Sequence, residues 1–164
     1  MAARRLVTDK EFLSFRECVP RMVASVMDLG LLTGHSLSAI LQLRWKDVEA
    51  IGRPREKWVL IVGRIRSGNP RRLAITPTIE GVLKTCKIML PHWPREFVFR
   101  LEDGRGVSVK EFNMIWNLYM RRWGGVGPGS SRFSFRDIRI KALTDQQTVR
   151  RVSRRRTPRS GKAV

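Results

Sequence analysis

Arginines gather at two places in the sequence where they could act together on phosphate groups. Arg66, Arg71 and Arg72 flank a turn-forming Ser-Gly-Asn-Pro stretch, and Arg136 and Arg139 begin the last helical segment. A guanidinium is always charged and offers a planar fork of donors that matches phosphate oxygens. These two groups therefore predict a surface that binds nucleic acid, whereas the simpler interpretation is that each is an exposed, solubilising residue.

The overall composition favours the first interpretation. The 164 residues include 33 Lys and Arg against 14 Asp and Glu, a formal net charge of +19, and 42% of them are hydrophobic. This length and apolar content suit one folded domain, and the charge points to a polyanionic partner. We find no apolar run that could span a bilayer and no signal-peptide core, so we expect a cytoplasmic protein without a membrane partner.

The residues that commonly bind metals or form disulfides are few and scattered. Cys18 and Cys86 have no paired spacing, and His35 and His92 have no companion ligand. The glycine-rich stretch 124–131 lacks the Gly-Lys-Ser/Thr ending of a phosphate-binding loop. We therefore expect no metal, no cofactor and no small-molecule substrate.

The elements that must position the arginines form a mixed α+β pattern, mostly helical. Apolar spacing and capping residues predict helices, and two strand-like runs joined by the Ser-Gly-Asn-Pro turn predict a small antiparallel β-sheet on one side. The expected helices cover about 8–15, 22–32, 37–45, 77–89 and 108–123 and start again near 135, and the expected strands are 58–62 and 72–75.

Three stretches in order resemble the tyrosine recombinases, the phage integrase family. Leu32–Asp47 (LTGHSLSAILQLRWKD) is similar to the family's Thr-Gly-x-Arg signature, which is followed by a leucine helix and Arg-Trp-x-Asp. Arg66–Pro77 is similar to the hairpin turn that carries a lysine in the family. Phe135–Arg139 is similar to the family's His-x-x-Arg box. The resemblance implies the catalytic domain alone, without the amino-terminal domain that completes the clamp around DNA. In the Arg-Trp-x-Asp element, we expect Arg44 to pack and pair near Asp47 rather than touch a substrate.

The resemblance also implies a chemistry, and this chain departs from it at several positions. In the family a tyrosine attacks the scissile phosphate while cationic donors hold the phosphate oxygens. Ser36 stands where the first arginine is expected and Ala39 where its supporting acid is expected. Arg66 replaces the hairpin lysine and Arg136 the box histidine, and an arginine holds its proton too tightly to be a general acid. Only Arg139 matches the catalytic set directly.

The nucleophile of the family is also missing from its expected place. No Leu-Gly-His stretch and no tyrosine follow Asp145, and the one tyrosine of the chain, Tyr119, lies earlier on an apolar helical stripe. We therefore expect a DNA-binding protein of this family, linked to DNA recombination and integration, without strand cleavage of its own. Two alternatives stay open: an active recombinase with an unusual nucleophile or one supplied in trans, and a basic RNA- or ribosome-binding protein.

The carboxy-terminal end differs in composition from the rest. From Arg150 onward the chain has six Arg, one Lys and no acid, with few apolar residues. Such a segment buries too little surface to offset its ordering entropy. The sequence thus predicts a catalytic-like domain over 1–146 and a basic, disordered tail over 147–164. Double-stranded DNA is the expected partner, and a full-length recombinase is a further candidate partner.

Overall fold

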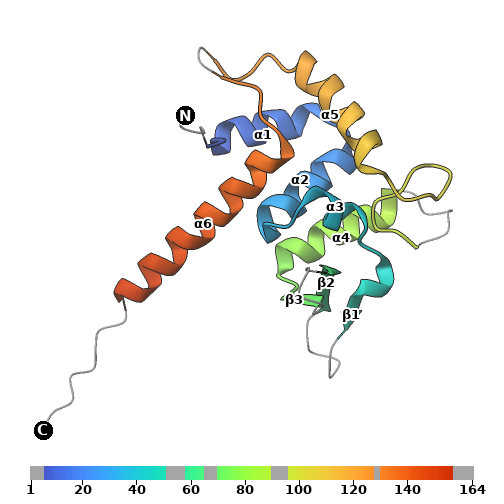
Figure 1. Cartoon of the computed structure of the whole chain (residues 1–164), viewed down its shortest axis with the longest axis horizontal. Helices are drawn as coiled ribbons and strands as arrows, with labels where there is room; N and C mark the ends of the chain where they lie inside the picture. Colours follow the sequence, from blue (N-terminus) through green and yellow to red (C-terminus); the bar gives the residue numbers. More distant parts are fainter. Residues whose placement is uncertain (1–5, 51–57, 65–69, 90–95, 128–129, 157–164) are drawn as a thin grey trace, which may run out of the picture.

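A computed structural model describes residues 6–50, 58–64, 70–89, 96–127 and 130–156 (Figure 1). The elements are α1 (Asp9–Cys18), α2 (Arg21–Thr33), α3 (Leu37–Leu41), the 3₁₀ turn η1 (Trp45–Asp47), β1 (Val48–Ala50), β2 (Trp58–Arg64), β3 (Pro70–Ala74), α4 (Pro77–Met89), α5 (Val109–Arg122) and α6 (Phe135–Arg156). This confirms the mostly helical α+β class. In the described residues no helix is long and apolar enough to cross a membrane.

Most helices begin and end within a few residues of the predicted bounds, although α3 ends at Leu41 and not near residue 45. The Thr8 side chain accepts the Glu11 N–H at 3.2 Å, while the Glu11 carboxylate accepts the Thr8 N–H at 3.0 Å, a capping box that starts α1. Ser108 and Glu111 start α5 in the same way. At the end of α2, Gly34 has φ of 68° and its N–H bonds the Gly30 carbonyl. A residue with a Cβ would be strained there, so this glycine fixes where the chain leaves α2.

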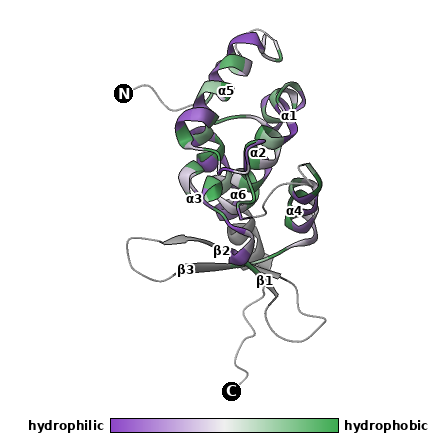
Figure 2. Cartoon of the chain, turned by 90° about the vertical axis from the view of Figure 1, so that its right-hand side faces the viewer, coloured by the Kyte–Doolittle hydropathy of each residue, from purple (hydrophilic) through white to green (hydrophobic). Residues whose placement is uncertain are grey.

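The sheet lies at one end of the helices (Figure 2) and is antiparallel, in the order β1-β2-β3. Its hairpin register pairs Leu60 with Leu73, and the pairing shifts between Val62 and Arg64. The two predicted strands are confirmed, whereas β1, which is only three residues long, was not predicted. The tip of the β2–β3 hairpin, 65–69, lies outside the described residues.

An aromatic cluster joins α1, α5 and the segment that leads into α6. The Phe15 ring lies 4.8 Å from the Trp116 ring and 5.4 Å from the Phe133 ring, both edge-on. The Trp116 indole also donates a hydrogen bond to the Phe133 carbonyl at 3.3 Å. Edge-to-face pairs of this kind add to the stabilisation from burial alone. The cluster therefore fixes the position at which α6 begins.

Helix α6 then packs closely against α2. A Cβ built on Gly30 would lie 2.4 Å from the Phe135 ring, so only glycine permits this approach. Further along α6, Ile138 and Ala142 are buried, and Leu143 lies against the Gly34 position. The end of α2 and the first half of α6 therefore form one packed unit.

The prediction of disorder from residue 147 is wrong for the first part of that segment. Helix α6 continues to Arg156, and Figure 1 shows its second half extending beyond the other helices. Once the capped, packed first turns have formed, each further residue adds one hydrogen bond, and Arg and Gln are good helix formers. Residues 157–164 lie outside the described part of the chain.

Candidate nucleic-acid interface

The retained arginine of the His-x-x-Arg-like box is anchored to the loop between α2 and α3. The Arg139 Nε donates a hydrogen bond to the Gly34 carbonyl oxygen at 3.0 Å. This bond uses one of the five guanidinium N–H donors and leaves the two terminal nitrogens for other partners. Arg139 is otherwise exposed, so the bond fixes a cationic fork at the protein surface.

Ser36 lies two residues beyond Gly34, where the resemblance places the first phosphate-clamping arginine. Its Oγ accepts the Ala39 N–H at 3.4 Å and lies 3.3 Å from the Ser38 Oγ, so it acts as the N-cap of α3. A serine here supports the local fold but contributes no charge to the surface beside Arg139.

The first turn of α6 presents a second arginine. Ser134 donates from both its N–H and its Oγ to the Asp137 carboxylate, each at 2.8 Å, which holds the start of the helix. Arg136 lies within this turn and is exposed, three residues before Arg139. Residues three apart on a helix are neighbours, and the helix N-terminus itself favours an anion. We call the surface that carries Ser36, Arg136 and Arg139, where the α2–α3 loop meets the start of α6, the junction surface.

The hairpin arginines cannot be added to this surface. Arg71 and Arg72 belong to β3, where their partners across the hairpin are Val62 and Ile61. Arg66 lies outside the described residues. A role for these three arginines in binding therefore stays a prediction.

Arg44 packs as predicted but pairs with a different acid. Its Nη1 lies 2.8 Å from the Glu96 carboxylate, and its guanidinium lies 5.0 Å from the centre of the Phe97 ring. Asp47 instead accepts the Arg44 backbone N–H at 3.0 Å. The expected Arg44–Asp47 pairing is thus a backbone contact. Glu96 was not anticipated because it reaches Arg44 only through the bridge between Arg44 and Phe97.

Lys141 has a positioning role that the sequence reasoning missed. Its Nζ lies 2.7 Å from the Asp9 carboxylate and 3.0 Å from that of Asp145, although only 10% of the side chain is exposed. Burial lowers the pKa of Lys141, but the bonds to Asp9 and Asp145 outweigh it and raise the pKa overall. The spacing of Lys141 and Asp145 was a visible signal, whereas the link to α1 depends on the fold.

The described residues include no group of three or more His, Cys, Asp or Glu that could hold a metal ion. Cys86 is buried, which raises the pKa of its thiol to about 11, and Cys18 is exposed. His35 is half-buried in the α2–α3 loop, and His92 lies outside the described residues. Tyr119 is half-buried and packs against the core, in agreement with its place on an apolar stripe.

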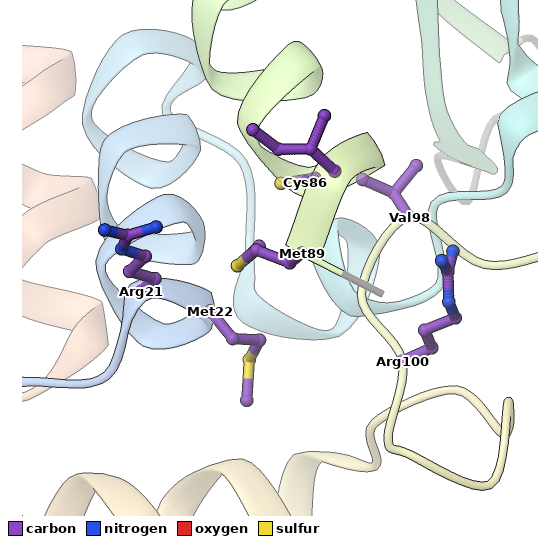
Figure 3. Close-up of a pocket in the computed structure, with 7 residues that line it drawn as sticks. Arg21, Met22, Cys86, Met89, Val98 and Arg100 are labelled. Atoms are coloured by element: carbon purple, nitrogen blue, oxygen red, sulfur yellow. The ribbon is translucent and has the colours of Figure 1, made fainter. Parts of the chain in front are cut away.

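A cavity of about 450 Å³ lies away from the junction surface. Figure 3 shows Met22 from α2 and Cys86 and Met89 from α4 around it, with Arg21 and Arg100 at its sides. Met22 is near the start of α2, whereas Gly34 follows its end. The cavity is therefore a separate feature from the surface that holds Arg139.

Comparison with known proteins finds no matching family model and no matching curated sequence. Solved structures do match. The Tn1549 transposon integrase (residues 82–397) in complex with circular intermediate DNA superposes with a TM-score of 0.71 at 12% identity, over 91% of this chain and 54% of that one. A lambda integrase (75–356) dimer bound to a COC′ core site gives 0.68 at 16% identity, over 98% and 59%. The lambda integrase catalytic core gives 0.65 at 17% identity, over 96% of each chain.

The fold is that of a tyrosine recombinase catalytic domain. The chain spans little more than half of the first two integrase structures but nearly all of the lambda integrase catalytic core. The part of the chain that superposes thus corresponds to the integrase catalytic core. Within the integrase fold, the α2–α3 loop and the start of α6 are brought together although about 100 residues of sequence separate them.

Proposed function

We propose that this chain binds double-stranded DNA through the junction surface and takes part in DNA recombination or integration without efficient strand cleavage of its own. The main support is the Arg139–Gly34 bond, because it holds a charged fork beside a second exposed arginine at a helix N-terminus. The solved structures with the same fold include integrases bound to DNA. The net charge of +19 adds long-range attraction for a polyanion.

The same positions argue against efficient catalysis. Ser36 supplies no cation where the resemblance implies one, and its hydroxyl is engaged as a helix cap. Arg66 and Arg136 replace a lysine and a histidine, and an arginine does not release a proton near neutral pH. Loss of one donor to a developing charge typically costs about 10²–10³ in rate. Several such changes in one site support binding without cleavage.

One assay separates binding from chemistry. The purified protein is mixed with duplex DNA carrying a nick near candidate crossover sites, and each sample is run on a native gel and on a denaturing gel. We expect a shift on the native gel and no covalent adduct on the denaturing gel. Arg136→Gln with Arg139→Gln should weaken the shift more than Arg121→Gln with Arg122→Gln, a control pair of exposed arginines on α5 that also removes two charges.

Other outcomes would favour the alternatives. A covalent adduct would indicate an active recombinase, and its loss in Tyr119→Phe would identify that tyrosine as the nucleophile. An adduct formed only when a full-length recombinase is added would indicate a nucleophile supplied in trans. Preferential binding to RNA in competition would favour the RNA- or ribosome-binding alternative, and no shift at low salt would contradict the proposal.

A further inference from the structure

Helix α6 has a buried face and an exposed face, and the described side chains fix which is which. Ile138 is fully buried and Ala142 is 2% exposed, so both belong to the side packed on the body. Arg136, Arg139 and Gln147 are exposed. An α-helix turns by about 100° per residue, which places these three within about 80° of one another around the axis. They define the outer face of α6.

The outer face continues past the body as a line of arginine positions. Arg154 lies in the same direction around the helix axis as Arg136, and the direction of Arg150 differs from that of Arg136 by about 40°. The helix backbone is continuous from Phe135 to Arg156. By contrast, Arg155 and Arg156 lie about 100° and 160° away from Arg136, off the outer face.

The length and the positive charge of the outer face suit a contact with duplex DNA. From Arg136 to Arg154 the helix rises about 27 Å, close to the rise of eight base pairs, since each base pair adds about 3.4 Å. No acidic residue follows Asp145 in α6 to oppose the arginines. A small anion would occupy one point of such a face, whereas a DNA backbone presents phosphates along its whole length.

We propose that α6 is an extended DNA-contacting helix, and that Arg150 and Arg154 prolong the junction surface along the phosphate backbone of the same duplex. The inference rests on the proposed function, because the junction surface must bind DNA for α6 to extend that contact. It differs from a disordered basic arm in one respect that can be tested. A helix contributes by the face on which its arginines lie, whereas a disordered arm contributes by their number.

The first test compares two pairs of substitutions that remove the same charge from the same helix. Arg150→Gln with Arg154→Gln removes two outer-face arginines, and Arg155→Gln with Arg156→Gln removes two off-face arginines. Duplex binding is measured at several salt concentrations, with circular dichroism as a check on helix content. We expect the outer-face pair to lower affinity about tenfold or more and to reduce the slope of log K against log salt by about 2. The off-face pair should change both much less.

The second test keeps Arg150 and Arg154 and changes only the direction in which they lie around the helix axis. Two alanines inserted between Gln146 and Gln147 turn the distal half of α6 by about 200°, whereas four alanines leave it only about 40° from its original direction. Because the 200° turn would bring Arg155 and Arg156 toward the outer face, both insertions are made in the Arg155→Gln, Arg156→Gln variant. We expect the two-residue insertion to weaken duplex binding about as much as the outer-face pair. The four-residue insertion should restore most of the affinity.

Each outcome bears on either the helix or the function. Equal losses from the two arginine pairs, or from the two insertions, would overturn the inference and indicate a tail that acts by charge alone. No loss from either pair, with a loss from Arg136→Gln and Arg139→Gln, would overturn the inference and leave the proposed function standing. If the unaltered chain fails to bind duplex DNA, the proposed function fails first.

Discussion

Arg139 and Gly34 lie 105 residues apart in sequence and are joined by a hydrogen bond of 3.0 Å from the arginine Nε to the glycine carbonyl. The bond connects the start of α6 to the loop that follows α2. Because Gly34 also lies against Leu143, the loop and the helix contact each other at two positions. The orientation of the Arg139 guanidinium is therefore a property of the packed fold, not of α6 alone.

This anchoring makes Arg139 sensitive to a substitution that preserves its charge. In the proposed complex the guanidinium bonds Gly34 through Nε and offers its two terminal nitrogens to a phosphate, whereas in Arg139→Lys one compact ammonium group would have to make both contacts. We expect the affinity for duplex DNA to fall about tenfold, the typical effect of losing one charge-assisted hydrogen bond. Filter binding or fluorescence anisotropy would measure the change.

Arg136→Lys is the matched control for this prediction. Arg136 makes no ion pair or hydrogen bond with the described residues, so a lysine keeps what it offers, a mobile charge. Its affinity should stay within about threefold of the unaltered chain. Equal effects at positions 136 and 139 would mean that the Gly34 bond does not orient the binding group.

The approach of α2 to α6 predicts a large cost for a single methyl group. In Gly30→Ala the new Cβ would meet the Phe135 ring at 2.4 Å, so the two helices must separate or the ring must move. Overpacking of this kind costs about 1–3 kcal/mol of unfolding free energy. Urea denaturation followed by tryptophan fluorescence would measure it, and DNA binding should fall as well because Phe135 begins α6.

The control is a helix glycine with open space around it. Gly81 lies in α4 with no atom within 4 Å of a built Cβ. Gly81→Ala should therefore stabilise the protein by about 0.5–1 kcal/mol through helix propensity. The opposite signs of the two substitutions separate packing from propensity. A neutral Gly30→Ala would contradict the close contact between α2 and Phe135.

The capping box of α5 predicts a pH dependence of stability. Hydrogen bonds from the Ser108 side chain and backbone, with Arg105 adding a third, lower the pKa of Glu111 from 4.5 to about 2. Below pH 4.5 the unfolded chain takes up this proton more readily than the folded one. The stabilisation is therefore complete above about pH 4.5 and is lost as the pH falls toward 2.

The measurement compares urea midpoints from pH 2 to pH 7 for the unaltered chain, Glu111→Gln and Ser108→Ala. We expect the difference between the unaltered chain and Glu111→Gln to shrink as the pH falls through this window. The difference in urea midpoint between the unaltered chain and Ser108→Ala should also shrink as the pH falls, because this substitution removes the donor that contributes most to the lowered pKa of Glu111. Curves that stay parallel down to pH 2 would contradict the lowered pKa of Glu111.

Local signals predicted the elements but not how they meet. Helix boundaries are marked by residues that bond backbone groups only a few positions away, here Thr8, Gly34, Ser36 and Ser108. The resemblance identified the fold because two of its three motifs, Leu32–Asp47 and Phe135–Arg139, come from segments that this fold brings together. The Arg139–Gly34 bond and the Lys141–Asp9 pair could not be predicted, since each joins residues more than 100 positions apart.

The error about α6 has a different cause. Composition alone predicted disorder from residue 147, because it measures how much surface a segment can bury. A helix that is already nucleated can extend with little burial, and the buried residues Phe135, Ile138 and Ala142 anchor α6 well before that point. Only the fold reveals that the basic segment continues such a helix.

Ser36→Arg tests whether this chain exchanged a phosphate contact for a helix cap. The substitution removes the Oγ that accepts the Ala39 N–H, and should lower the unfolding free energy by about 1 kcal/mol. It also adds a cation two residues from Gly34, and should raise duplex affinity with an increase of about 1 in the slope of log K against log salt.

Ser36→Ala isolates the loss of the helix cap, because it removes the hydroxyl and adds no charge. Equal stability losses in the two variants, with a gain in affinity only for arginine, would show that the serine favours local stability at the expense of phosphate binding. If Ser36→Arg binds no better than Ser36→Ala, position 36 does not face the DNA and the junction surface must be redrawn without it.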